Sequence, residues 1–188
     1  PVSTQVNVMT HIAKARKNRG AKLYVVDPYR TPTAQQADVH LCLKPGTDGA
    51  LACAVMHVLF RDGYADRDYM AKYTDVPDEL EAHLKSRGPE WASQITGLTV
   101  DEIEAFAKAY GETDRVYIRV GYGFTRSRNG SANMHTVSCL PAVGGKWKYE
   151  GGGALHSNRS MYGVNQSLVR GLEFVDPSKR ALDMSRIG

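Results

Sequence analysis

The chain has 188 residues, of which 42% are hydrophobic and 23% are charged, and this is the composition of an ordinary globular protein. That length is enough for one sizeable domain. No segment approaches the roughly 18 consecutive apolar residues that a membrane span needs, so we expect none here. The net charge of +4 comes from scattered basic residues, the densest cluster being 14–19. Because no aromatic residues or reader motif accompany them, we expect no nucleic-acid partner.

The cysteines and the start of the chain bear on compartment and completeness. Cys42, Cys53 and Cys139 are too few and too far apart for a disulfide framework or a zinc site, and we expect Cys42 and Cys53 to be small buried hydrophobes. This usage favours a reducing compartment, so we expect a cytoplasmic location, with the periplasm as the alternative. Pro1 is neither an initiator methionine nor part of a signal peptide, and we expect an internal fragment of a longer protein.

Apolar periodicity predicts helices that alternate with short strands. In chain order we expect a helix at 6–20, a short buried strand at 23–26, a strand at 39–44, a helix at 51–63, a polar helical stretch with breaks at 66–91, a helix at 99–110, a strand at 116–120 and a helix at 132–140. Thr99 and Glu102 predict a capping box at the start of the helix at 99–110, with Leu98 and Ile103 at the positions of a hydrophobic staple. This alternation predicts an α/β fold with a largely parallel sheet. Because the sequence turns irregular and glycine-rich after 143, we expect a domain at 1–143 and an irregular extension at 144–188.

Two carboxylates, Asp27 and Asp48, stand next to ends of predicted elements. Ligands of open parallel sheets bind at the carboxyl ends of the strands, and Asp27 directly follows such a strand. Its carboxylate can accept hydrogen bonds from ribose hydroxyls or from the N–H edge of a guanine, but an Asp-Pro turn that only ends the strand is an equal alternative. Asp48 precedes a helix, where it is either an N-cap or part of a ligand-facing turn, and spacing alone favours the cap.

A third candidate position is Gly121-Tyr122-Gly123, after the last predicted strand, with Arg126 as a possible phosphate ligand. The third glycine of the nicotinamide-dinucleotide fingerprint is absent, and no acidic residue follows about 20 positions on, so the sequence does not predict an NAD site. His135, Ser138 and Cys139 lack an orienting partner for nucleophilic catalysis. The residues alone predict a dinucleotide-type binding domain without visible chemistry of its own.

Short motifs nevertheless recur along nearly the whole chain. The most informative are VDPYRT (26–31), KPGTDGAL (44–51) and GYGFTR (121–126), and the others are GAK (20–22), AD (37–38), ITGL (95–98), the glycine pairs and triplets at 144–145 and 151–153, and DMSRIG (183–188). In order and spacing this series resembles the molybdopterin oxidoreductase family, the dimethyl-sulfoxide-reductase superfamily that includes formate dehydrogenases and periplasmic nitrate reductases. The resemblance implies a Rossmann-like, three-layer α/β domain with a mostly parallel sheet, incomplete because the chain is a fragment.

The resemblance also implies a cofactor, bis(molybdopterin guanine dinucleotide) with molybdenum or tungsten. The positions that match cofactor-binding motifs are Asp27, Pro28, Tyr29, Arg30 and Thr31 for the guanosine, with Asp27 as the acceptor; Gly46, Thr47 and Asp48 for a neighbouring guanosine contact; and Tyr122 and Arg126 for the pterin. The segment 1–4 matches the loop after the first strand of the family domain. Arg126 stands where the family often has Gln, and 144–151 carries extra residues, so the sequence departs from the family at both places.

The resemblance assigns no catalytic residue and no metal ligand to this chain, since none of its cysteines stands at a ligand position. We expect the iron–sulfur cluster and the metal ligand elsewhere in the parent enzyme, this fragment alone to be inactive, and its partners to be the remaining domains and an electron-transfer protein. The alternatives are a cofactor-free structural homologue in an electron-transfer complex and an unrelated nucleotide-binding α/β domain. Asp27, Asp48 and the glycine turn at 121–123 favour the cofactor-binding domain, because a purely structural copy needs none of them.

Overall fold

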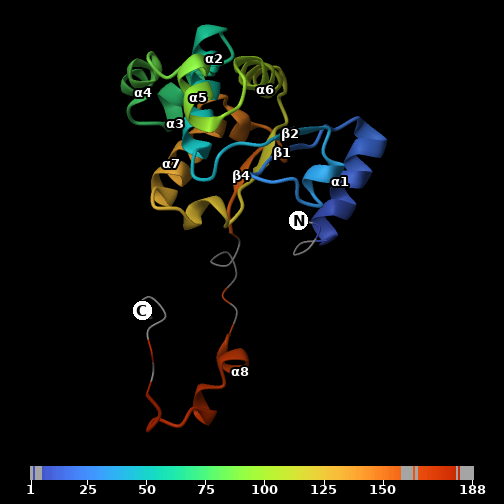
Figure 1. Ribbon diagram of the computed structural model, residues 1–188, viewed down its shortest axis with the longest axis vertical. Coiled ribbons are helices and arrows are strands. Elements are labelled where there is room, and N and C mark those ends of the chain that lie inside the picture. The colour runs from blue at the N-terminus through green and yellow to red at the C-terminus, as the bar shows by residue number, and fades with distance from the viewer. Residues whose placement is uncertain (1, 3–5, 158–162, 164, 181, 183–188) are drawn as a thin grey trace. The chain divides into compact units, whose positions relative to one another are not determined.

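A computed structural model describes residues 2, 6–157, 163, 165–180 and 182 (Figure 1). Its contacts divide the chain into two units, Pro1–His156 and Ser157–Gly188, which are described separately. The DMSRIG motif at 183–188 and most of the segment 1–4 lie outside the described residues.

The helices and strands alternate as predicted, and the fold is mixed α/β. They are α1 (Val6–Arg19), β1 (Tyr24–Val26), β2 (Val39–Leu41), α2 (Asp48–Arg61), α3 (Arg67–Tyr73), α4 (Pro77–Leu84), α5 (Pro89–Thr96), α6 (Val100–Glu112), β3 (Tyr117–Arg119), α7 (Gly130–Val143), β4 (Gly153–Leu155) and α8 (Ser167–Arg170), with 3-10 turns η1 (Ala34–Gln36), η2 (Phe124–Arg126), η3 (Lys146–Lys148) and η4 (Leu172–Phe174). No described helix combines the length and apolar character that crossing a bilayer requires.

Both described pairs of strands are parallel, which confirms the predicted sheet type. β1 pairs with β2, with Tyr24 opposite Val39, and β3 pairs with β4, with Tyr117 opposite Gly153. Parallel pairing brings the carboxyl ends of two strands to the same edge. The segments that follow β1 and β2 therefore leave their sheet together, and so do those that follow β3 and β4.

Helix α2 is the centre of the core. Eight of its 14 residues are buried, as expected for a helix that is apolar around most of its circumference. It packs against α5, α6 and α7, and Figure 1 shows α2 to α6 gathered together, with α1 set apart from them beside the β1–β2 pair. The hydrophobic core of the first unit consists of Leu41, Leu43, Leu51, Val55, Met56, Val58, Leu59, Met70, Leu84, Leu98, Ile103, Tyr110, Leu140 and Val143, together with four alanines.

The start of α6 confirms the predicted capping box. Thr99 Oγ1 accepts a hydrogen bond from the Glu102 N–H at 3.2 Å, and the Thr99 N–H donates to Glu102 Oε2 at 2.8 Å. Leu98 and Ile103, at the positions of a hydrophobic staple, are both buried. Sequence alone is sufficient here because all the interacting groups lie within one helical turn of each other.

Two burial predictions are wrong. The strand at 23–26 is only partly covered, with Val26 37% exposed, because the described helices leave part of the β1–β2 sheet open. Cys42 is exposed rather than buried, since β2 ends at Leu41 and Cys42 lies past the end of the strand.

The predicted boundary after residue 143 also differs from the structure, in which the first unit extends to His156. The reason is β4, which pairs with β3 and holds the segment that follows α7 against the sheet. Within the second unit, α8 and η4 contain no buried residue, and Leu168 is 93% exposed.

Candidate cofactor-binding site

The turn after β1 begins at Asp27. Its N–H donates to the Leu41 carbonyl at 3.2 Å, which extends the β1–β2 ladder by one residue. Asp27 Oδ1 accepts from the Tyr29 N–H at 3.4 Å, so the Asp-Pro turn considered as an alternative is present. This one long hydrogen bond uses a small part of the capacity of a carboxylate, which can accept about four. Asp27 therefore serves the turn and retains acceptor capacity for a ligand.

The other predicted residues of this turn have different surroundings. Pro28, Tyr29 and Arg30 are exposed, and the Tyr29 ring is 66% exposed. Thr31 is half-buried, and its Oγ1 accepts from the Ala34 N–H at 3.2 Å at the start of η1. The structure thus gives Thr31 a local role, while Pro28, Tyr29 and Arg30 present their side chains to solvent.

The second predicted segment, Gly46-Thr47-Asp48, leads into α2. The N-cap of α2 is Thr47, but its Oγ1 donates to the Lys44 carbonyl at 2.6 Å and accepts no hydrogen bond from the helix. Asp48 is the first residue inside the helix, so the N-cap role that spacing favoured for it is wrong. Gly46 has a φ of +79°, a conformation that side-chain-bearing residues rarely adopt.

Helix α7 supplies the missing cap from a distant part of the chain. Asn133 is only 3% exposed; its Oδ1 accepts from the Gly49 N–H at 3.1 Å, and its Nδ2 donates to the Gly46 carbonyl at 3.1 Å. Asn129 Nδ2 donates to the same carbonyl at 2.9 Å. A Cβ on Gly49 would lie 2.7 Å from Asn133 Oδ1, so the approach of the two helices requires glycine. Sequence analysis missed both asparagines, because no local pattern links them to the Gly46 turn.

The electrostatics of Asp48 connect the two predicted segments. Partial burial raises the pKa of Asp48, and the neighbouring negative charge of Asp27 raises it further, against the opposing effect of the Asp48 N–H. The structure therefore brings the two carboxylates close enough for one to disfavour ionisation of the other. Two like charges held at one edge form a set of acceptors for a ligand rich in N–H and O–H donors.

The residues predicted to face the pterin lie at the carboxyl end of β3. Tyr122 is 49% exposed, and its ring lies 4.5 Å from that of His156, at an interplanar angle of 56°. Arg126 is exposed at the end of η2. Ser127, the next residue, adjoins the first site, since a Cβ on Gly46 would lie 3.5 Å from the Ser127 Cβ. The two predicted groups are therefore neighbours through this loop.

His156 is a further site residue that the sequence analysis did not single out. It directly follows β4, at the same edge as Tyr122, because β3 and β4 are parallel. Its Nδ1 is buried and has no hydrogen-bond partner among the described residues. A buried polar atom of this kind at a strand edge has the capacity to bond a ligand.

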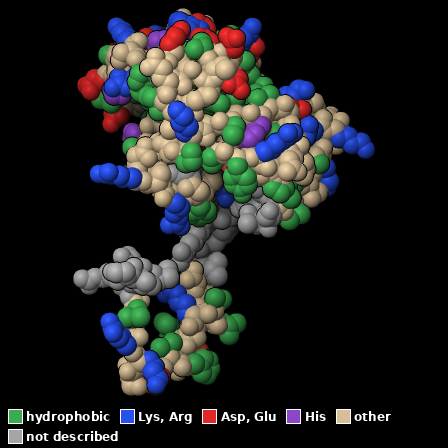
Figure 2. Space-filling view, viewed as in Figure 1, with side chains coloured by type: hydrophobic (Ala, Val, Ile, Leu, Met, Phe, Trp, Pro, Cys, Tyr) green, Lys and Arg blue, Asp and Glu red, His purple; other side chains and the backbone are tan. Residues whose placement is uncertain are grey.

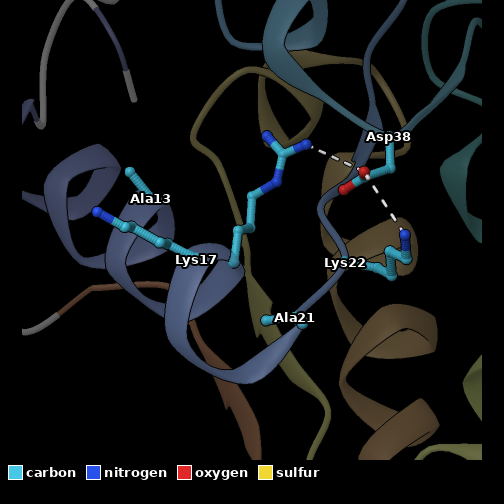
Figure 3. Close-up of a pocket in the computed structure, with 7 residues that line it drawn as sticks. Ala13, Lys17, Ala21, Lys22 and Asp38 are labelled. Carbon is cyan, nitrogen blue, oxygen red and sulfur yellow. Dashed lines mark hydrogen bonds and ion pairs between the residues drawn. The ribbon is translucent and has the colours of Figure 1, made fainter.

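A separate hollow of about 480 Å³ lies between the end of α1 and β1 (Figure 3). Figure 3 shows Lys22 directed at Asp38. Arg16 and Lys22 lie 3.0 and 4.0 Å from Asp38 Oδ1, and Asp38 Oδ2 accepts from the Leu23 N–H at 2.8 Å. The Leu23 N–H, followed by the two cations, lowers the pKa of Asp38. These contacts hold α1 to the segments that precede β1 and β2. The charged residues around the hollow therefore have a structural role.

On the face shown in Figure 2, basic side chains are scattered over the first unit and form no single stripe. Among the described residues, no group of three His, Cys, Asp or Glu side chains is arranged to hold a metal ion. The fold and its polar edges thus define an α/β domain of the class that binds ligands at the carboxyl ends of parallel strands.

Comparison with known proteins identifies the family. The family model described as Molybdopterin oxidoreductase matches residues 1–186, and the chain belongs to this family. It is 37% identical over 188 residues to the "Probable oxidoreductase YoaE" of Bacillus subtilis, covering 100% of this chain and 28% of that protein. It is 30% identical over 192 residues to the "Dimethyl sulfoxide reductase DmsA" of Haemophilus influenzae, covering 92% of this chain and 23% of that protein.

A solved structure agrees with this assignment. The "Acetylene Hydratase from Pelobacter acetylenicus" superimposes with a TM-score of 0.67 and 27% sequence identity, over 73% of this chain and 19% of that one. The chain therefore spans less than a third of the length of the relatives it matches. It corresponds to one part of proteins of this kind.

Proposed function

We propose that this chain holds the guanosine end of a bis(molybdopterin guanine dinucleotide) cofactor within a molybdenum or tungsten oxidoreductase. The observation that supports the proposal is that Asp27 and the segment leading to Asp48 follow two parallel strands, β1 and β2, and that the charge of Asp27 raises the pKa of Asp48. Family membership supports a pterin cofactor with molybdenum or tungsten, and the two relatives are an oxidoreductase and a reductase by name.

The chemistry of the donor set fits a guanosine. The Watson–Crick edge of guanine carries N–H donors that one carboxylate can accept as a bidentate pair, and the ribose hydroxyls offer further donors to the other carboxylate. Gly46 places no side chain in front of these carboxylates, and the exposed Tyr29 ring offers an apolar surface for a base. Hydrogen bonds to the ionised form of Asp48 offset the burial that otherwise disfavours its charge.

The second group of residues extends the proposal toward the pterin. Tyr122, Arg126 and His156 lie around the carboxyl ends of β3 and β4, where an aromatic pair, a cation and a buried ring nitrogen are available to orient a polar ring system. When bound, the cofactor supplies the metal at which two-electron or oxygen-atom chemistry takes place, and the protein contributes binding and orientation. The remaining domains of the parent enzyme and an electron-transfer protein are the partners that this role requires.

Guanosine recognition is tested by titrating the 188-residue chain calorimetrically with GDP and with ADP. We expect a preference for GDP, and a loss of about 10-fold in GDP affinity for Asp27→Asn and for Asp48→Asn, because each change removes a charge-assisted acceptor. Asp101→Asn is the matched control, since Asp101 is exposed on α6 and lies outside the site. Equal affinity for GDP and ADP, or wild-type affinity in both site variants, would refute the proposed recognition.

A further inference from the structure

One side chain in β2, His40, and one just past its end, Cys42, hold the backbone of the Asp27 turn. His40 Nε2 lies 3.0 Å from the Asp27 carbonyl oxygen, and Cys42 Sγ donates to the Pro28 carbonyl oxygen at 3.3 Å. A carbonyl oxygen only accepts hydrogen bonds, so Nε2 of His40 carries the hydrogen in this contact. These two side chains therefore bond the carbonyl groups of Asp27 and Pro28, on either side of the proline ring.

The Asp27 N–H bond to the Leu41 carbonyl fixes the residue before the proline, and the His40 and Cys42 contacts act on the peptide planes that follow it. Pro28 has no N–H and cannot donate to a neighbouring strand. Within the turn, Tyr29 donates to Asp27 Oδ1 at the long distance of 3.4 Å, and Thr31 donates to the Tyr29 carbonyl at 2.9 Å. Neither bond fixes the orientation of the two peptide planes on either side of Pro28. The side chains from β2 supply that orientation, and the position of the Asp27 carboxylate depends on it.

We propose that His40 and Cys42 are positioning residues for the nucleotide: by holding the Asp27 and Pro28 carbonyl groups, they fix the Asp27 carboxylate in the direction that a guanosine requires. This inference rests on the proposed function of the Asp27 turn and deepens it. The pair acts through the backbone, so a side chain that keeps a donor at the same place preserves the effect, whereas one that removes the donor does not.

The test compares donor-removing with donor-keeping substitutions in the 188-residue chain. GDP affinity is measured by calorimetry for His40→Ala and His40→Gln and for Cys42→Ala and Cys42→Ser. Hydrogen exchange of the Tyr29 and Thr31 amides measures the order of the turn. We expect a loss of about 3- to 10-fold for His40→Ala and about 2- to 3-fold for Cys42→Ala, because a thiol is the weaker donor. The Gln and Ser variants should stay within about 2-fold of wild type, and both Ala variants should exchange faster at Tyr29.

Cys53→Ala is the control for thiol removal, because Cys53 lies on α2, outside the Asp27 turn. Wild-type affinity and wild-type exchange in both Ala variants overturn the inference, and so does an equal loss in the donor-keeping variants. If the wild-type chain binds no GDP, the proposed function fails by itself. Amide exchange then decides the positioning role, which stands if exchange accelerates in the Ala variants alone and falls if it does not.

Discussion

Asn133→Ala is the substitution that most directly tests how the Gly46 turn is built. The Gly49 N–H belongs to the first turn of α2, where backbone donors have no acceptor within the helix. Asn133 Oδ1 accepts its hydrogen bond, and both residues are buried. Truncation therefore leaves a buried donor unsatisfied. The Gly46 carbonyl keeps a donor in Asn129, so the variant creates one orphan group and not two.

The size of the effect follows from that count. A buried donor left without a partner costs about 1–3 kcal/mol, and loss of a helix cap costs typically about 1 kcal/mol, so we expect Asn133→Ala to lower the free energy of unfolding by about 2 kcal/mol. Asn129→Ala is the matched control: Asn129 is exposed, and the Gly46 carbonyl retains Asn133, so the expected loss is at most about 0.5 kcal/mol.

Urea denaturation followed by circular dichroism measures both losses. Similar losses in the two variants would refute the cap argument, because the two asparagines would then act only through the shared Gly46 carbonyl. Asn133→Asp sharpens the test, since it keeps an acceptor for the Gly49 N–H but directs a carboxylate at a carbonyl oxygen. We expect this variant to be less stable than wild type at pH 7 and to recover as acid protonates the new carboxyl group.

Five further substitutions test the site and its surroundings, the first three by urea denaturation and the two glycine variants by thermal unfolding. Asp48→Asn should raise the free energy of unfolding at pH 7, because folding raises the pKa of Asp48 and the ionised carboxylate therefore opposes folding. The difference in stability between the variant and wild type should shrink as acid protonates Asp48. A difference that grows toward acid would contradict this. Asp66 caps α3 and pairs with Lys148, so Asp66→Ala should lower the free energy of unfolding by about 1 kcal/mol through the lost cap, and Lys148→Ala should lower it less because the ion pair is exposed. The contribution of Asp66 should fade as the pH falls through its lowered pKa. Equal losses in the two variants would indicate that the ion pair, and not the cap, stabilises this turn. Gly123→Ala should keep the thermal midpoint of wild type, because the φ of Gly123 is −58° and an added Cβ would meet no atom within 4 Å. Gly130→Ala should not fold normally, because its Cβ would overlap the Thr125 carbonyl oxygen. A clear loss of stability in Gly123→Ala would show that a neighbouring group packs against this glycine.

Local interactions were predictable from the sequence, and long-range ones were not. The capping box at Thr99 was predicted because its partners lie three residues apart. The segments 27–31 and 46–48 were placed at element ends for the same reason. In contrast, Asn133 bonds a residue 84 positions away, and the contact between Tyr122 and His156 depends on β4 pairing with β3. Periodicity gives the identity of an element and its apolar face, but the partner that completes a turn comes from the packing of whole elements.

The position of Asp48 is the strongest reason to regard the edge as a site and not only as a turn. An N-cap carboxylate accepts hydrogen bonds from the helix, which favour its charge and lower its pKa. Asp48 has the opposite property, since burial and the charge of Asp27 raise its pKa. The cap of α2 is supplied by Asn133 instead, so Asp48 is not needed as a cap, although its charge in the first turn still interacts favourably with the helix dipole. The proposed guanosine accounts for the remaining cost of this carboxylate, because its N–H and O–H groups offer hydrogen-bond donors to both Asp48 and Asp27.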